Sequence, residues 1–450
     1  MSHLQIKDFL NTVCEQIKYK PIRQNIADEL ENHVEEIKES YIKEGLNKKI
    51  AENKAIEQMG EAEEIGKMLN KIHKPKFDWK LCLIVMILLG FGFLISYIRT
   101  TGIVTTGNQM NYMTKYVVAV IIGFIISIGI YFFDYKKIFK YSNYIYAFAT
   151  IIIICGIPYL RMGMLEISID VIAVPLYIIA FVGFLIGQDK KSKIQNRLEK
   201  LNIKVNLNLI KTILFSIISI ILLLGIPAKA SALILGLIYL IIATVKTLKT
   251  SENKKINIIT LWAIPIILGI IIMTIYLSGT FRLDRITAVF NPESDPEGSG
   301  WLALNRKSII NSAQYFGEAD DISQAIELFD EGTNFAFISI LAHYGWIVGA
   351  VLVITILLLC IKLIINIVEI KDLSGKLLII GISTMFILQS IFNILMNLNL
   401  GIEANFNLPF VSYSVENLII NMMSLALILS VYRRKNIIIT VKNKTNDCLN

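Results

Sequence analysis

Two arginines three residues apart, Arg282 and Arg285, are the first candidates for chemistry in this sequence. They follow directly on an apolar stretch, in Phe281-Arg-Leu-Asp-Arg285. On a helix, residues at this spacing share a face. Paired guanidinium groups near a membrane interface favour binding of the phosphate or pyrophosphate of a lipid headgroup. Simple anchoring of the chain at the interface by the two arginines is the alternative interpretation.

The segment that contains this pair, residues 278–334, is long, acidic and rich in turn-forming residues. Ten acids stand against four bases. Residues 290–301, Phe-Asn-Pro-Glu-Ser-Asp-Pro-Glu-Gly-Ser-Gly-Trp, predict a fixed, folded loop. Connections of this length are usually either functional or unstructured, so a solvated acidic loop is the alternative. The acids are Asp284, Glu293, Asp295, Glu297, Glu318, Asp320, Asp321, Glu327, Asp330 and Glu331.

Polar residues also occur inside apolar stretches near the end of the chain. Gln389 and Asn393 lie one helical turn apart, and Leu408-Pro-Phe-Val-Ser-Tyr413 places Pro409, Ser412 and Tyr413 at membrane depth. Polar side chains at such positions usually face the interior of a helix bundle or a wet cavity. Hydrogen bonding between helices is the purely structural alternative.

The elements that must position these residues are membrane-spanning helices. The 450 residues are 54% hydrophobic and 18% charged, and the mean hydropathy is +0.60. These values exclude an ordinary soluble enzyme, a disordered chain and a fibrous repeat, and the apolar runs are too continuous for a membrane β-barrel. We predict an all-α, polytopic membrane protein with ten spans. They cover roughly residues 79–98, 116–133, 144–159, 171–187, 210–226, 230–245, 256–277, 335–361, 377–397 and 408–431.

The charges of the connections give the orientation. With ten spans and both termini in the cytoplasm, the Lys-rich connections lie inside and the acidic segment 278–334 lies outside, as the positive-inside rule requires. The net charge of +8 therefore indicates a membrane protein and not a nucleic-acid partner. We expect no signal peptide, because a polar stretch precedes the first apolar run.

The polar stretch itself, residues 1–78, predicts a small cytoplasmic helical domain with apolar residues at helical spacing. A solvated bundle is one interpretation and a partner-docking or regulatory domain is the other. The spans and their loops form a second domain at 79–434, and residues 435–450 form a cytoplasmic tail. The five cysteines and four histidines make no metal or disulfide pattern. No cofactor is indicated, and a divalent cation is left open.

Several motifs together resemble the SEDS proteins (shape, elongation, division and sporulation), the FtsW/RodA/SpoVE group. The likeness covers about residues 80–434, including the number of spans. The first 78 residues resemble instead a helical prefix domain found before some permease-type proteins of Gram-positive bacteria. The SEDS-like segments are Phe133–Lys136, Arg282–Gly300, Thr333–Gly349, Gln389–Asn393, Leu408–Tyr413 and Tyr432–Arg434.

The resemblance implies a fold, an activity and a location. SEDS proteins are multi-pass proteins of the bacterial cell membrane that polymerise lipid II, an undecaprenyl-linked precursor, on the outer face during cell-wall growth, division or sporulation. They usually work with a class B penicillin-binding protein. In that chemistry a carboxylate deprotonates the acceptor hydroxyl and cationic groups hold the leaving pyrophosphate. The substrate-binding residues that it implies are Arg282, Arg285, Glu293, Asp295, Thr333, Gln389, Asn393, Pro409, Ser412 and Tyr413.

One departure bears directly on catalysis. The family's proposed catalytic Asp follows a Thr, whereas this sequence has Asn334 after Thr333. An amide cannot act as a general base. Three interpretations remain open. Asp330 or Glu331 acts as the base in place of the family's Asp, or Asn334 only positions the acceptor while another acid acts, or polymerase activity is lost. We therefore predict a lipid II glycosyltransferase-type protein, with a degenerate scaffold or regulator that binds lipid II or a synthase as one alternative and a precursor transporter as another.

Overall fold

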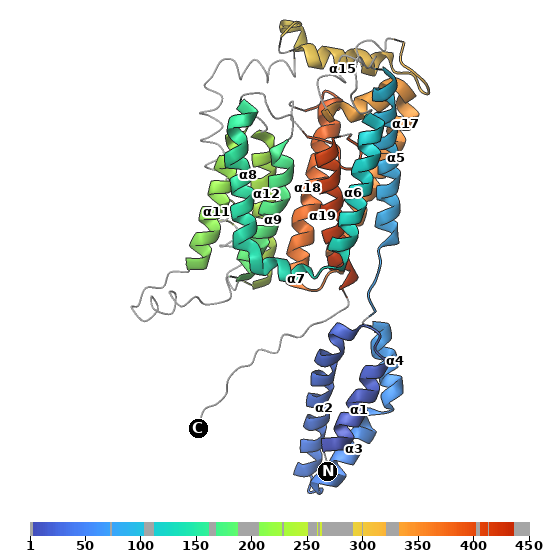
Figure 1. The fold of residues 1–450 in the computed structure, drawn as a ribbon, viewed down its shortest axis with the longest axis vertical. Helices are drawn as coiled ribbons and strands as arrows, with labels where there is room; N and C mark the ends of the chain where they lie inside the picture. The colour runs from blue at the N-terminus through green and yellow to red at the C-terminus, as the bar shows by residue number, and fades with distance from the viewer. Residues whose placement is uncertain are drawn as a thin grey trace. The chain divides into compact units, whose positions relative to one another are not determined.

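The computed structural model divides into two compact units, and its regular structure is helical throughout the part that it describes. One unit contains Met1–Phe77 with Tyr432–Asn450, and the other contains Asp78–Val431 (Figure 1). The ranges that the structure describes are 3–72, 74–102, 112–161, 168–187, 207–226, 229–250, 259, 262, 291–298, 300–320, 333–401, 406–412 and 414–435.

The N-terminal unit is a small bundle of amphipathic helices. Its core is formed by apolar side chains at helical spacing, among them the fully buried Val13, Ile17 and Val34. Two glycines with positive φ, Gly45 and Gly60, end α2 and α3, since this backbone conformation is costly for other residues. The elements are α1 (His3–Gln16), η1 (Lys20–Ile22), α2 (Arg23–Lys43), α3 (Lys48–Met59) and α4 (Ala62–Ile72).

The second unit confirms the prediction of an all-α membrane protein with many spans. Eight of its described helices are long and apolar enough to cross a membrane: α5 (Trp79–Gly102), α6 (Tyr112–Phe132), α8 (Ser142–Arg161), α9 (Ile169–Gly187), α12 (Lys229–Thr250), α17 (Ala336–Glu369), α18 (Leu373–Asn397) and α19 (Val415–Arg433).

The number of ten spans stays a prediction. The apolar helix α11 (Leu207–Leu224) corresponds to the predicted fifth span, but its apolar part, Lys211–Leu224, is shorter than the other spans. The predicted seventh span, 256–277, lies outside the described residues except for Ile259 and Trp262. The last helix begins at Val415 and not at 408, because Pro409 cannot donate a helical hydrogen bond and Phe410 has φ of +66°.

Helix α9 lies in the middle of the bundle, between α8, α11, α12 and α18 (Figure 1). Most of its residues are buried, including Tyr177 and Phe181. Helices α5 and α6 are instead apolar on their outward faces, as expected for helices in contact with lipid.

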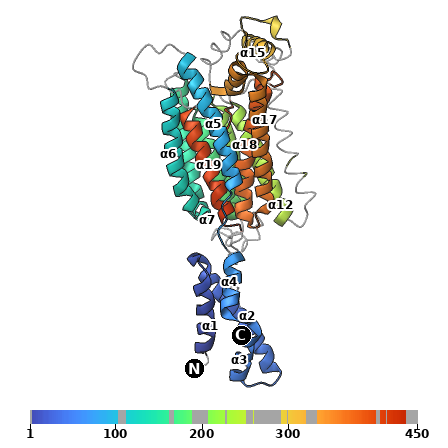
Figure 2. The same ribbon diagram turned by 90° about the vertical axis from the view of Figure 1, so that its right-hand side faces the viewer.

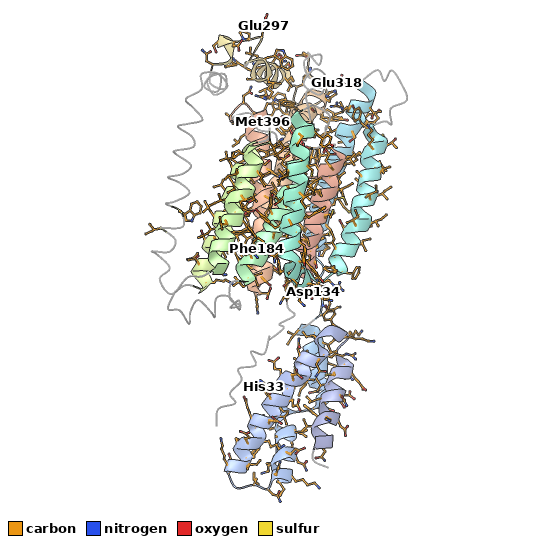
Figure 3. All side chains as sticks on the ribbon, turned by 60° about the vertical axis from the view of Figure 1, so that its left-hand side comes forward. His33, Asp134, Phe184, Glu297, Glu318 and Met396 are labelled. Carbon is orange, nitrogen blue, oxygen red and sulfur yellow. The ribbon has the colours of Figure 1, made fainter. Side chains whose placement is uncertain are left out.

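The two ends of this unit are chemically different. Helix α15 (Trp301–Ser312) covers one end, where Glu297, Glu318 and Met396 also lie, and Asp134 lies at the other end (Figures 2 and 3). At the Asp134 end, the short helix α7 (Tyr135–Ile138) reaches the start of α18. Tyr135 Oη and Lys136 Nζ each lie 3.0 Å from a carboxylate oxygen of Asp372. The predicted Phe133–Lys136 motif thus joins two helices far apart in the sequence.

Candidate functional site

The Thr333–Phe335 turn, η4, is held against α18 through the backbone of Asn334. The side-chain amide of Asn393 donates to the carbonyl oxygen of Asn334 at 2.8 Å and to that of Phe406 at 2.5 Å. Asn397, one turn later, donates to the same Asn334 carbonyl at 3.1 Å. Both α18 residues are fully buried. Three segments distant in the sequence therefore meet at one cluster of amides.

Arginine 306 fixes α15 above this cluster. Its side chain is only 2% exposed, and its Nε donates to Asn399 Oδ1 at 2.8 Å. Its guanidinium lies 5.8 Å from the centre of the Phe335 ring, within the range of a cation–π interaction. Asn399 has φ of +58° and donates its amide to the Ala303 carbonyl at 2.8 Å. Arg306 therefore joins α15, the end of α18 and the turn that carries Asn334.

A break in α17 forms a second joint at this end of the bundle. Gly345 has φ of +83°, and a Cβ there would lie 2.6 Å from the Gln314 carbonyl oxygen. The segment after α15 forms hydrogen bonds with the backbone groups of α17 that the break leaves without helical partners. The Ala319 amide donates to the Ala342 carbonyl at 2.7 Å, and the Trp346 amide donates to Gln314 at 3.0 Å. His343, just before the break, has Nδ1 3.1 Å from the Ser339 carbonyl oxygen.

The predicted loop motif forms a compact turn before α15. Asp295 accepts the Gly300 amide with its backbone carbonyl at 2.9 Å, and its carboxylate lies over Gly298. A Cβ on Gly300 would lie 2.1 Å from the Pro292 carbonyl oxygen, so the turn requires glycine there. Glu293, by contrast, is exposed and pairs with Lys307 at 3.4 Å. Residues 291–298 and Gly300 are therefore folded back on α15.

The segment 406–412 is a buried, non-helical entrance to α19. Pro409 and Ser412 are buried, and the carbonyl of Phe410 accepts from Tyr116 Oη at 3.4 Å. The Phe410 ring packs against Phe386 with centroids 5.3 Å apart. Pro409 and Ser412 therefore lie in the bundle interior, whereas Tyr413 lies outside the described residues.

The structure thus brings together Asn334 and Asn393 but does not place every predicted residue at that cluster. Glu293 contacts Lys307 on α15, and Gln389 lies one turn from Asn393 on the same helix. The side chain of Thr333 is not described. The predicted residues Arg282, Arg285, Asp330, Glu331 and Tyr413 lie outside the described residues.

Sequence reasoning missed Arg306, Asn397 and Asn399. Asn397 carried a usable signal, because it continues the Gln389, Asn393 series at a spacing of four on one helix face. Arg306 carried none, because it was one of four bases in an acidic loop. Its burial depends on the docking of α15, which local sequence does not reveal.

This architecture, with a membrane bundle covered at one end by a folded loop, agrees with the family comparison. Residues 172–437 match the model of the cell cycle protein family FtsW/RodA/SpoVE. The chain belongs to this family. The match contains most of α9, the loop turn, α15 and α17–α19, so all the described contacts around Asn334 lie within the matched region.

The FtsW/RodA/SpoVE relatives are distant. The probable peptidoglycan glycosyltransferase FtsW of Nitrosomonas europaea is 21% identical over 388 residues, covering 80% of this chain and 94% of that protein. FtsW of Enterococcus hirae is 30% identical over 164 residues, 36% of this chain and 40% of that protein. Stage V sporulation protein E of Bacillus subtilis is 28% identical over 161 residues, covering 35% of this chain and 43% of that protein. In the FtsW of Trichlorobacter lovleyi the match spans only 44% of the relative.

Solved structures of the family share the fold. A chain from a study titled structural coordination of polymerization and crosslinking by a peptidoglycan synthase complex aligns with a TM-score of 0.58 and 17% identity, covering 80% of this chain and 98% of that chain. The rod shape determining protein RodA of Thermus thermophilus aligns with a TM-score of 0.51 and 16% identity, covering 80% of this chain and 97% of that chain. At this identity the likeness describes the fold alone.

Proposed function

We propose that this protein is a peptidoglycan glycosyltransferase-type member of its family that acts on lipid II at the outer face of the bacterial cell membrane. The observation that carries the proposal is the cluster around Asn334. A turn at the position of the family's proposed catalytic residue is held by Asn393 and Asn397 and covered by α15 through Arg306. Relatives named peptidoglycan glycosyltransferase support the same activity.

The reaction assigns a separate task to each group. A base takes the proton from the acceptor sugar hydroxyl, the hydroxyl oxygen attacks the anomeric carbon of the donor, and the bond to the undecaprenyl pyrophosphate breaks with its electron pair on the leaving group. Asn334 cannot take the proton. Asp330 and Glu331, four and three residues before it, are the candidate bases. Arg282 and Arg285 are the candidate groups for the pyrophosphate.

The amide of Asn334 favours a second function, a scaffold or regulator that binds lipid II or a partner synthase without polymerising it. In this case the same site binds the lipid-linked sugar but lacks the base. A class B penicillin-binding protein is the proposed partner in either case, since a relative in structure comes from a peptidoglycan synthase complex.

Glycan-strand formation from purified protein and lipid II separates the two functions. The native chain and the variants Asn334→Asp and Asp330→Ala are compared, each with and without a candidate class B partner. Polymer from the native chain that is lost in Asp330→Ala supports the enzyme with Asp330 as base. Polymer only from Asn334→Asp supports the scaffold. If the native chain and Asn334→Asp both bind lipid II but neither forms polymer, the enzyme proposal fails.

The proposed orientation places both termini in the cytoplasm and α15 outside. The basic residues Lys136, Lys137 and Lys376 lie at the opposite end from α15, which supports this orientation by the positive-inside rule. A membrane-impermeant maleimide should label Glu318→Cys and not Lys137→Cys in intact cells. The reverse pattern would invert the topology and remove the proposed site from the outer face.

A further inference from the structure

Helix α4 of the N-terminal unit has a buried face that is fixed by close packing. A Cβ on Gly66 would lie 2.6 Å from Gln16 Cβ and 2.8 Å from the Val13 carbonyl oxygen, so the α4 backbone lies directly against α1. Ile65 and Leu69 pack into the same core. The opposite face of α4 therefore points away from the unit.

The second half of that outward face is both apolar and basic, whereas the first turn carries Glu63, which pairs with Lys67 at 3.4 Å. Met68 and Ile72, one turn apart, are 60% and 56% exposed. Lys67 and Lys71 occupy the neighbouring row at the same spacing and are also exposed. Phe77, five residues after Ile72, is 56% exposed. Large apolar side chains beside lysines are typical of helices that lie in a membrane interface.

The charge of the unit is strongly polarised. Between Lys67 and Phe77 four lysines stand against no acid. Residues 28–44 of α2 and the turn after it carry seven acids and two lysines. The basic end is the one that the chain connects to the first membrane span, which begins two residues after Phe77.

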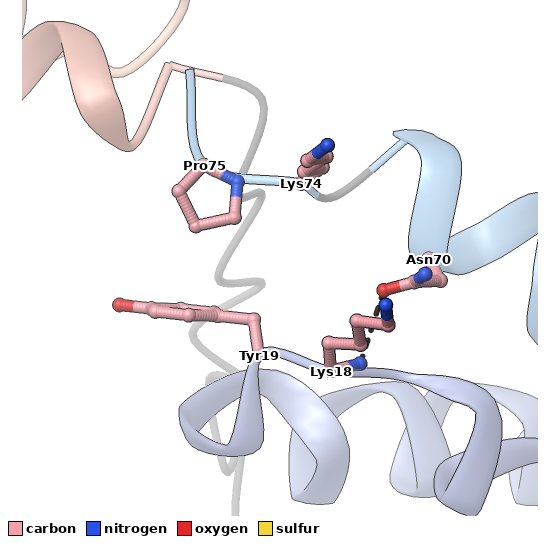
Figure 4. Close-up of a pocket in the computed structure, with 5 residues that line it drawn as sticks. All are labelled: Lys18, Tyr19, Asn70, Lys74 and Pro75. Carbon is pink, nitrogen blue, oxygen red and sulfur yellow. Dashed lines mark hydrogen bonds between the residues drawn. The ribbon is translucent and has the colours of Figure 1, made fainter. Parts of the chain in front are cut away.

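A recess lies beside the basic face and has the composition of a headgroup site. It has a volume of about 360 Å³ and is lined by Lys18, Tyr19, Asn70, Lys74 and Pro75 (Figure 4). Asn70 Oδ1 accepts the Lys18 backbone amide at 3.0 Å, which fixes the floor of the recess. The side chains of Lys18 and Lys74 are exposed, so their ammonium groups are accessible to an anion.

We infer that this surface, formed by Lys67, Met68, Lys71, Ile72 and Lys74, binds an anionic lipid surface. The apolar pair enters the acyl boundary, while the lysines and the recess bind lipid phosphates. Only Asp78 separates Phe77 from the start of α5, so the chain tethers this surface to the first span, which raises its effective concentration at the bilayer. The inference stands independently of glycosyl transfer.

Flotation with vesicles tests the inference on residues 1–77, because this unit has a core built from its own helices. The fragment should float with vesicles of phosphatidylcholine and phosphatidylglycerol in equal parts and not with phosphatidylcholine alone. Binding should weaken as salt is raised. Lys71→Glu with Lys74→Glu should lower the partition coefficient at least about tenfold. Met68→Ser with Ile72→Ser should also lower it on the mixed vesicles, because the apolar pair no longer enters the acyl boundary.

The control variant reverses two exposed lysines at the start of α3, Lys48→Glu with Lys49→Glu. It changes the net charge by the same amount and should leave binding within about twofold. Equal loss in both charge variants would reduce the effect to net charge and overturn the inference. Absence of flotation with anionic vesicles would also overturn it, as would binding only to a protein partner.

In the full chain, the same inference predicts slower amide exchange over residues 67–77 in anionic than in neutral nanodiscs. The protection should disappear in Lys71→Glu with Lys74→Glu and persist in the α3 control. Equal exchange rates in the two lipids would contradict the inference even if the fragment floats.

Discussion

The side-chain amide of Asn393 and the backbone carbonyl of Asn334 are 2.8 Å apart, although 59 residues separate them in the sequence. The second hydrogen of the same amide is used by the Phe406 carbonyl. One side chain on α18 thus holds two non-helical segments, the Asn334 turn and the entrance to α19. The backbone of Asn334 is therefore held by α18.

Replacing Asn393 by alanine should therefore destabilise the protein and impair its function together. The variant removes the Asn393 donor from the buried Phe406 carbonyl and leaves the Asn334 carbonyl with the Asn397 amide, at a cost of about 1–3 kcal/mol for the lost donor. The midpoint of thermal unfolding in detergent should fall, and lipid II binding should weaken. Gln389→Ala, one turn earlier on the same helix, is the matched control. If both variants unfold alike, Asn393 has no special role at the turn.

Glycine 345 should tolerate no side chain. Alanine at φ of +83° costs about 1–2 kcal/mol from its backbone conformation alone. Its Cβ would also meet the Gln314 carbonyl oxygen at 2.6 Å, which forces the segment after α15 to move. We expect Gly345→Ala to lower the unfolding midpoint and to increase proteolysis near residues 314–319.

Gly129→Ala on α6 is the control for this substitution, because nothing lies within 4 Å of the added Cβ. Alanine is the better helix former, so this variant should be neutral or slightly stabilising. If the two variants lose the same stability, the backbone conformation and close packing at Gly345 do not exclude a side chain there.

Asp372 should make the stability of the unit depend on pH. Burial alone would raise the pKa of this carboxyl group, but hydrogen bonds from Ser374 and the Gly375 amide, together with the ammonium of Lys136, outweigh it and lower the pKa. Because the folded-state pKa lies below the unfolded value of about 3.9, the ionised group stabilises the fold at neutral pH. This contribution is lost as the pH falls through the folded-state pKa.

Two variants separate the charge of Asp372 from its helix cap. Asp372→Asn keeps an acceptor for the Gly375 amide and loses the ion pair, whereas Asp372→Ala loses both, and cap removal costs about 0.5–2 kcal/mol. The unfolding midpoints should fall in that order at pH 7, and the difference between the Asn variant and the native protein should shrink as the pH falls below the unfolded-state pKa and through the lower folded-state pKa. A constant difference between native and Asn variant from pH 3 to 7 would exclude the ionised state as the cause.

The sequence was sufficient for features that depend on local pattern. Hydropathy predicted the helices of the membrane unit, and polar residues within apolar spans predicted that Asn393 faces the bundle interior. The turn residues around Asp295 predicted a folded loop, since glycine and proline constrain the backbone wherever they occur. The helix break at Gly345 was missed, because the apolar run 335–361 has no local signal at that glycine that distinguishes a break from a helix.

Features that depend on docking were beyond the sequence. Whether Arg306 is solvated or buried depends on whether α15 lies on the bundle end, and that depends on packing of Ile309 and Trp301 against residues of α5 and α17. The helical pattern of α15 is too short to reveal this face. The family resemblance could therefore name residues of the site, but the sequence could not predict their contacts in space.

Arg306 offers the sharpest test of that docking. It is 2% exposed, donates to Asn399 and lies over the Phe335 ring, next to Asn334. Arg306→Ala should loosen α15 at a cost of about 1–3 kcal/mol, because the Asn399 acceptor loses its donor. Arg306→Lys should not restore stability, since an ammonium cannot reproduce the planar guanidinium contact. Unfolding midpoints and the rate of proteolysis within 300–320 measure both variants.

The neighbouring residue Lys307 supplies the matched control for Arg306. Lys307 and Glu293 are 54% and 72% exposed as side chains and lie 3.4 Å apart, so their ion pair contributes little. Lys307→Ala should change the unfolding midpoint hardly at all and leave α15 resistant to protease. A loss in Lys307→Ala as large as in Arg306→Ala would mean that charge on α15, and not the buried guanidinium, holds this helix on the bundle. The order Arg306→Ala, Arg306→Lys, Lys307→Ala, from least to most stable, is the result that the geometry requires.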